Sequence, residues 1–172
     1  ETIVENAQKD TLNRGRIVST NKAEKFSELE LPEYLRTKTG MGELDRVLGG
    51  GLVVGSAILL AGEPGIGKST LLLQTSASIS ESEKDAKVLY ISGEESAGQI
   101  RSRADRLNLP TENIHILCTS KLEDIESALN EIQPVFCVVD SIQTVYTPEA
   151  GIVPGTVNQL KYCANELISW VK

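Results

Sequence analysis

Apolar and polar residues alternate along this chain in blocks whose lengths distinguish strands from helices. Four short apolar runs are typical of strands that are buried on both faces of a sheet. They span residues 57–61, 87–92, 113–118 and 135–140. Between and after them, apolar residues recur at the spacing of helices with one buried stripe. This alternation predicts an α/β fold with a mostly parallel sheet that helices flank on both faces.

Several helices are marked by their first residues. In a capping box, the residue that starts a helix and the residue three positions later bond to each other's backbone N–H groups. Three pairs fit this pattern: Ser96 with Gln99, Ser120 with Glu123, and Thr156 with Gln159. An earlier helix is predicted around residues 41–48, where Met41, Leu44, Val47 and Leu48 share one face and three glycines follow.

The two ends of the chain differ from its middle. Residues 1–30 carry mixed charges without sustained periodicity, which predicts a mobile N-terminal arm, although residues 26–32 could add a short edge strand. Residues 31–172 are predicted to form one domain. Four strands are few for a sheet of this type, and Lys172 lies in or just after a helix. We therefore expect an incomplete core and a longer parent protein.

Composition excludes several classes of function. The 172 residues carry a net charge of −7, which argues against a uniformly basic surface that coats nucleic acid. The three cysteines form no C-x-x-C pair, and His115 is the only histidine, so a zinc site is not expected. His115 lies between isoleucines in a predicted strand, where packing or edge exposure is more plausible than catalysis. No apolar run approaches a membrane span, and a cytoplasmic protein is predicted.

One glycine-rich motif indicates the chemistry. Residues 62–69, Gly-Glu-Pro-Gly-Ile-Gly-Lys-Ser, fit the phosphate-binding pattern G-x-x-x-x-G-K-[ST]. The motif follows the apolar run 57–61 and precedes a predicted helix, which is the context that such a loop requires. The predicted nucleotide-binding residues are Gly62, Glu63, Pro64, Gly65, Ile66, Gly67, Lys68, Ser69 and Thr70.

Each part of this loop has a physical role in holding a polyphosphate. The glycines allow backbone N–H groups to turn inward as an anion-binding nest, and the helix adds its free N-terminal donors. Lys68 is expected to reach the β- and γ-phosphates, and the Ser69 hydroxyl is the expected protein ligand for Mg²⁺. The alternative is an ordinary glycine-rich turn, which the Lys-Ser pair disfavours.

Acidic residues follow two of the predicted strands at the same edge of the sheet. Asp140 ends an apolar strand and could hold Mg²⁺ through water in the Walker B role, or simply cap a turn with Ser141. Glu94 is the first candidate for the base that activates water, with Glu95 as the second; both could instead be helix N-terminal acids. Gln143 could sense the γ-phosphate.

With these residues placed, the chain resembles the central ATPase domain of the bacterial RadA (Sms) family, a RecA-like group of P-loop NTPases. The resemblance runs from about residue 36 to residue 170. It rests on four segments: Thr39–Gly40 with Glu43–Gly51, the loop Gly62–Thr70, Ser92–Ser96, and Asp140–Thr144. The phosphate loop is widespread among proteins, whereas the Leu-Asp-Arg segment with three glycines and the Gly-Glu-Glu-Ser segment are much narrower.

This resemblance implies properties that the residues alone do not establish. It implies a RecA-like fold, ATP and Mg²⁺ as cofactors, homo-hexameric rings, and ATP hydrolysis that DNA stimulates. It also implies branch migration in recombination, with single-stranded or branched DNA and recombinase proteins as partners. Within it, Lys68 and Ser69 bind phosphate and Mg²⁺, Asp140 supports the metal and Glu94 activates water. Residues 146–158 take the position of a first DNA-facing loop.

Two other interpretations remain open. One is a signalling ATPase of the KaiC type, which has paired glutamates and acts on protein partners. The other is a nucleotide-binding fragment that does not turn over ATP. The loop 147–155 has Glu149 as its only charge, so the DNA role depends on the resemblance.

Overall fold

The computed structural model describes residues 35–82, 85–151, 153 and 155–171, together with Lys25 and Ser27. Residues Tyr34–Lys172 form one compact unit. The predicted N-terminal arm and the possible edge strand at 26–32 lie outside the described residues, apart from Lys25 and Ser27, which are exposed. The domain boundary between residues 30 and 31 therefore stays a prediction.

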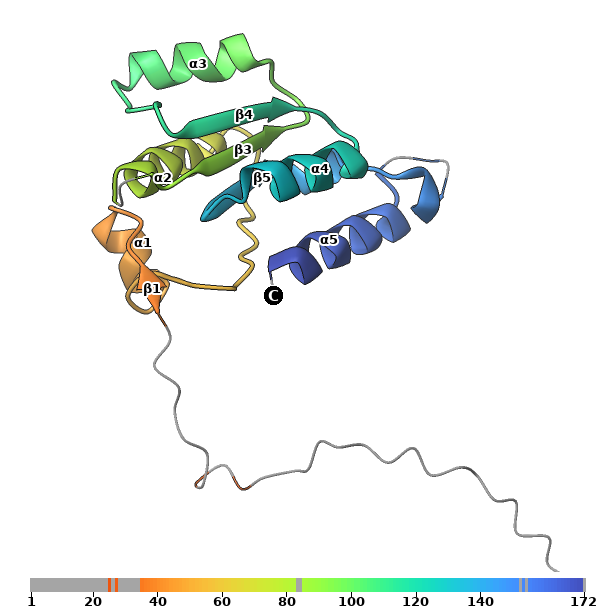
Figure 1. Cartoon of the computed structure of the whole chain (residues 1–172), viewed down its shortest axis with the longest axis horizontal. Helices are drawn as coiled ribbons and strands as arrows, with labels where there is room; N and C mark the ends of the chain where they lie inside the picture. The colour runs from red at the N-terminus through yellow and green to blue at the C-terminus, as the bar shows by residue number, and fades with distance from the viewer. Residues whose placement is uncertain are drawn as a thin grey trace, which may run out of the picture. The chain divides into compact units, whose positions relative to one another are not determined.

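A parallel sheet forms the centre of this unit (Figure 1). Its middle strand is β3 (Val88–Ser92), with β4 (Ile114–Cys118) on one side and β5 (Phe136–Asp140) on the other. The register pairs Ser92 with both Cys118 and Asp140, so the three carboxyl ends are level. A separate antiparallel pair joins β1 (Arg36–Thr37) to β2 (Leu52–Val53).

Helices connect these strands in the predicted order. They are α1 (Gly42–Val47), α2 (Lys68–Ser82), α3 (Ala97–Arg106), α4 (Leu122–Ile132) and α5 (Val157–Val171), with short 3₁₀ helices η2 (Ile142–Thr144) and η3 (Pro148–Ala150). The α/β class with a parallel sheet between helices is confirmed.

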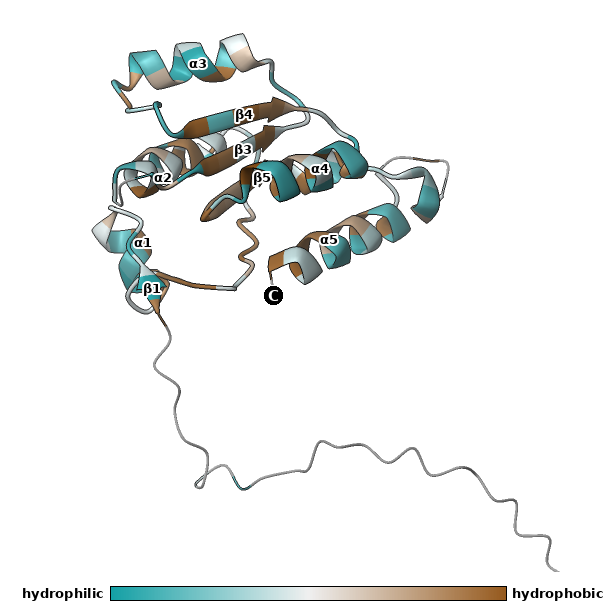
Figure 2. Ribbon diagram, in the orientation of Figure 1, coloured by the Kyte–Doolittle hydropathy of each residue, from teal (hydrophilic) through white to brown (hydrophobic). Residues whose placement is uncertain are grey.

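Two apolar clusters cover the two faces of the sheet. Successive side chains of a strand point to opposite faces, so β3 contributes to both clusters. Leu89 and Ile91 pack with residues of α4 and α5, whereas Tyr90 packs with residues of α2 and α3. All five residues of β3 are buried. Figure 2 shows the resulting distribution, with apolar strands at the centre and polar residues along the outer side of α3.

The apolar run before the phosphate loop differs from the prediction. No strand is assigned to residues 57–61, and they are exposed; Leu59 is 81% exposed. The segment is apolar, as the hydropathy colours of Figure 2 show, but no strand of the described residues pairs with it. A strand buried on both faces needs a hydrogen-bonded neighbour, because its own backbone groups are otherwise unsatisfied. The prediction of a fourth parallel strand is therefore wrong for this structure.

Smaller predictions had different outcomes. The Ser96–Gln99 capping box of α3 is confirmed. The second box is wrong, because α4 starts after Lys121 and has no side-chain cap. At α5 the Thr156 hydroxyl accepts from the Gln159 N–H at 3.4 Å. No residue of α1 is fully buried: Leu44 is half-buried, whereas Val47 is 77% exposed.

Candidate nucleotide-binding site

The phosphate loop folds back over the first turn of α2. Gly65 and Gly67 have φ angles of +78° and +102°, in the left-handed region that favours glycine. The Lys68 ammonium donates hydrogen bonds to the carbonyl oxygens of Gly62 at 2.7 Å and Glu63 at 2.9 Å. The lysine charge therefore lies inside the curve of the loop, at the positive end of the α2 dipole. This is a suitable cradle for a polyphosphate.

The carboxyl edge of the sheet brings together acidic residues that are far apart in the sequence. Asp140 ends β5 and is level with Ser92 at the end of β3. Glu94 follows β3 by two residues, and its Oε1 accepts a hydrogen bond from the Ser141 hydroxyl at 3.0 Å. Because Ser141 is the neighbour of Asp140, this bond holds the first candidate base beside the candidate Walker B carboxylate.

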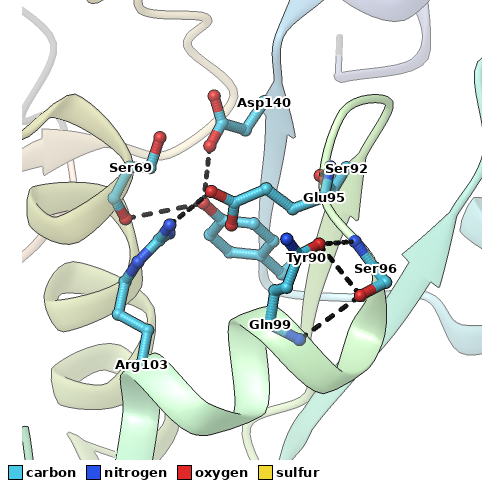
Figure 3. A network of polar contacts seen from close by, with 8 residues as sticks. All are labelled: Ser69, Tyr90, Ser92, Glu95, Ser96, Gln99, Arg103 and Asp140. Atoms are coloured by element: carbon cyan, nitrogen blue, oxygen red, sulfur yellow. Dashed lines mark hydrogen bonds and ion pairs between the residues drawn. The ribbon is translucent and has the colours of Figure 1, made fainter. Parts of the chain in front are cut away.

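The second candidate base has a different environment. Glu95 forms an ion pair with Arg103 of α3, and both side chains are largely buried, at 30% and 17% exposure (Figure 3). Its backbone N–H donates to the Ser92 hydroxyl at 3.0 Å. Glu95 is thus neutralised and fixed, whereas Glu94 is exposed. The geometry favours Glu94 over Glu95 as the residue that is free to meet a water molecule.

A buried tyrosine connects the loop helix to the Walker B strand. The Tyr90 hydroxyl donates to Asp140 Oδ2 at 2.9 Å and lies 3.5 Å from the Ser69 carbonyl oxygen (Figure 3). Burial, followed by the nearby Asp140 charge, raises the pKa of Tyr90 well above its usual range. The hydroxyl therefore stays protonated and remains a donor. Sequence reasoning missed this residue, because a tyrosine inside an apolar strand is ordinarily a core residue.

The remaining predicted residues have simpler environments. Gln143 lies exposed in η2, three residues after Asp140, and its role stays a prediction. Gly93 lies against Thr144 of the same short helix. His115 lies exposed on β4, which is an edge strand. Among the described residues, no three side chains of the metal-ligating types cluster together.

The predicted DNA-facing loop is tied to α5. The Gln159 side chain is fully buried; it accepts from the Thr147 N–H at 3.0 Å and donates to the carbonyl oxygens of Thr147 at 2.8 Å and Gly151 at 2.5 Å. Glu149 accepts from the Tyr162 hydroxyl at 2.8 Å. Ile152 and Pro154 lie outside the described residues. The described part of this loop is therefore closed by side-chain bonds and is acidic.

The residues present fit ATP and Mg²⁺. Hydroxyl and carboxylate oxygens are the protein ligands that Mg²⁺ uses beside phosphate, and Ser69 and Asp140 supply one of each. Tyr90 links the two elements that carry them. At Gly65 and Gly67, an added Cβ would meet nothing within 4 Å, so the loop is open on that side.

This chain is similar to known ATPases and to known DNA repair proteins. The KaiC family of ATPases matches residues 37–117, which include the phosphate loop and both candidate bases. A "DNA repair protein RadA" of Treponema pallidum is 63% identical over 137 residues, which are 80% of this chain and 29% of that protein. RadA proteins of Bacillus subtilis and Rickettsia felis are 48% and 53% identical, over 91% of this chain and 34% and 37% of their own lengths.

The predicted resemblance to the RadA family is confirmed. The chain carries a KaiC-type, RecA-like ATPase domain. It spans only about a third of the RadA relatives that it matches. Of the helices that the structure describes, none has both the length and the hydrophobicity that a membrane crossing requires.

Proposed function

We propose that this chain binds and hydrolyses ATP as the motor domain of a DNA repair and recombination protein. The observation that carries the proposal is that a side chain of β3 contacts both α2 and β5. The Tyr90 hydroxyl lies within 3.5 Å of Ser69 at the start of α2 and within 2.9 Å of Asp140 at the end of β5. This contact supports the proposal because α2 carries the predicted phosphate-binding residues and β5 carries Asp140.

In this proposal each residue has one task. The Lys68 ammonium exchanges its bonds to the loop carbonyls for bonds to the β- and γ-phosphates, and the loop N–H groups hold the same phosphates. The Ser69 hydroxyl and the Asp140 carboxylate would hold Mg²⁺, which would supply charge neutralisation for phosphoryl transfer. Glu94 orients a water molecule and accepts its proton, while Ser141 keeps the Glu94 carboxylate in place.

Nucleotide binding and hydrolysis are tested together. A fluorescent ATP analogue is titrated into the chain with Mg²⁺, and phosphate release is measured on the same sample. Lys68→Ala should weaken binding by at least about 100-fold, because a charge-assisted contact to two phosphates is lost. The matched control is Lys161→Ala, which removes a lysine from α5. If both variants bind like the unchanged chain, the nucleotide site is wrong. Binding without phosphate release supports the fragment interpretation.

The role in DNA repair is supported by the names of the relatives and not by local charge. The described loop between η2 and α5 presents Glu149 and lies near Glu123, which accepts from the Thr147 hydroxyl at 2.6 Å. A DNA-dependent motor should release phosphate faster with single-stranded DNA than without it, and branched DNA should be remodelled in the presence of ATP. Ring assembly, which sedimentation measures, should depend on nucleotide. This test requires a protein of the same length as the relatives. If DNA leaves its rate of phosphate release unchanged, the motor role is contradicted.

A second candidate is a signalling ATPase that acts on protein partners, which the match to the KaiC family favours. Such a protein would phosphorylate its own serine or threonine residues. Incubation with ATP followed by mass spectrometry distinguishes the two: phosphorylated residues without any DNA effect favour signalling, and DNA-stimulated hydrolysis without phosphorylation favours the repair role.

A further inference from the structure

Tyr90 occupies a position in which its ring and its hydroxyl have separate functions. The ring packs against Leu73 of α2, Ile100 and Ala104 of α3, and Val138 of β5, and the residue is 1% exposed. These contacts fix the ring between the two helices that cover one face of the sheet. A phenylalanine would make the same apolar contacts. The hydroxyl is therefore the feature that packing does not explain.

The hydroxyl fixes the orientation of one particular carboxylate. It donates to Asp140 Oδ2 at 2.9 Å, while Asp140 Oδ1 has no hydrogen-bond partner among the described residues. The contact with the Ser69 carbonyl oxygen at 3.5 Å is long for a hydroxyl donor, so Asp140 is the main acceptor. Held by one oxygen from a rigid ring, the carboxylate presents its other oxygen in a defined direction.

We propose that Tyr90 is a positioning residue that orients Asp140 toward the metal. This inference rests on the proposed function, since it requires a nucleotide-bound Mg²⁺ at Ser69 and Asp140. Residues that orient a metal-binding carboxylate commonly change metal affinity by about 10- to 100-fold when they are removed.

The test separates metal binding from nucleotide binding. The affinity for a fluorescent ATP analogue is measured in EDTA and then across a Mg²⁺ titration, with Tyr90→Phe and the unchanged chain. We expect Tyr90→Phe to need about tenfold more Mg²⁺ to reach half of the Mg²⁺-dependent change in affinity for the ATP analogue. Its affinity in EDTA should change by less than about twofold. In an Asp140→Asn background the Tyr90→Phe change should have no further effect, because the oriented group is gone.

Tyr162→Phe is the matched control. The Tyr162 hydroxyl also donates to a carboxylate, that of Glu149 at 2.8 Å, on an element away from the site. It should leave the Mg²⁺ titration unchanged. One result overturns the inference but keeps the proposed function. In it, Tyr90→Phe needs the same Mg²⁺ concentration as the unchanged chain, while Asp140→Asn loses the Mg²⁺ effect. Absence of nucleotide binding in the unchanged chain, or binding that Lys68→Ala leaves intact, overturns both.

A second measurement keeps the Tyr90 side chain in place. The four tyrosines of the unchanged sequence can be replaced biosynthetically by 3-fluorotyrosine. The ¹⁹F resonance of Tyr90 is then assigned by elimination with Phe variants of the other three. It should shift when Mg²⁺ is added to the nucleotide complex, while the Tyr162 resonance stays within its line width. A Tyr90 resonance that is insensitive to Mg²⁺ overturns the inference.

Discussion

The two sides of the candidate site differ in how they are held. On the sheet side, Asp140, Tyr90 and Glu95 lie in or beside strands with buried neighbours, and side-chain bonds connect them to α3 and α2. On the loop side, residues 54–67 are exposed throughout and belong to no strand. Yet the phosphate loop at the end of this segment has its left-handed glycines and its lysine bonds in place.

This contrast separates local from long-range determinants of structure. The loop conformation depends on glycine torsions and on the first turn of a helix, which are encoded within a few residues. A buried strand depends on a neighbour that offers hydrogen bonds and on helices that cover it. The first requirement is met within the loop and α2, whereas the described part of the chain provides no neighbouring strand for residues 57–61.

The largest expected effect is on the free energy of unfolding, and it distinguishes a buried leucine from an exposed one. Leu89 is 0% exposed in the middle strand, and Leu59 is 81% exposed in the segment before the loop. Leu89→Ala should lower the free energy of unfolding by about 3 kcal/mol, because it leaves a cavity between β3 and α4. Leu59→Ala should change it by less than about 0.5 kcal/mol. Urea unfolding followed by circular dichroism measures both, and equal losses would mean that residues 57–61 are packed in solution.

The next effect concerns the two glutamates. Glu94→Gln should reduce phosphate release about 100-fold while nucleotide affinity stays within about twofold, because it removes a proton acceptor and not a binding group. Glu95→Gln should instead lower stability by about 1–2 kcal/mol, since it leaves the buried Arg103 guanidinium without its partner. Steady-state kinetics and thermal unfolding of both variants measure this. The assignment is wrong if Glu95→Gln stops turnover and Glu94→Gln does not.

The sequence predicted those parts of the fold that short patterns determine. Strands at 88–92, 114–118 and 136–140 lie within one residue of the predicted ranges, and α3 begins with its predicted capping box. The same reasoning failed for residues 57–61, because an apolar run is not sufficient for a strand. Apolar composition determines what a segment can bury, but not whether a partner is present.

The candidate site was predictable where a residue type is itself diagnostic. Lys68, Ser69 and Asp140 follow from motif and strand position, and the structure places them on joined elements. Tyr90 and Arg103 could not be identified in this way. Tyr90 acts through contacts with residues 21 and 50 positions away in the sequence, and Arg103 acts through a residue that precedes its own helix. In such cases a core residue and a positioning residue have the same sequence pattern.

A smaller effect tests the turn that carries both glutamates. A Cβ added at Gly93 would lie 2.7 Å from Thr144 Cβ, so Gly93→Ala should lower the free energy of unfolding by about 2 kcal/mol and displace η2. Gly65→Ala in the phosphate loop meets no neighbour, and its cost should be about 1 kcal/mol from its left-handed torsion alone. In chemical denaturation, Thr144→Gly should recover part of the loss at Gly93 and none at Gly65; recovery at both would contradict the contact.

The smallest effect concerns Glu126 of α4 and its acidic neighbours. Burial, followed by the charges of Glu166, Glu123 and Glu149, raises the pKa of Glu126 above its usual range. The folded state therefore binds this proton more tightly than the unfolded state does. It follows that the stability from this group is present below the unfolded pKa and is lost as pH rises through the folded pKa.

Glu126→Gln should accordingly raise the unfolding midpoint slightly at pH 7, where the glutamate would be charged. The difference should vanish below about pH 4, where the carboxyl is protonated in both states. Thermal unfolding between about pH 4 and pH 8 measures this dependence. Glu63→Gln removes the same charge from the exposed loop and controls for net charge. A gain of the same size and pH profile in both variants would mean that overall charge, and not the packing of α4 against α5, sets the effect. In that case Glu126, which lies among other side chains, and Glu63, which is exposed to solvent, would affect stability in the same way.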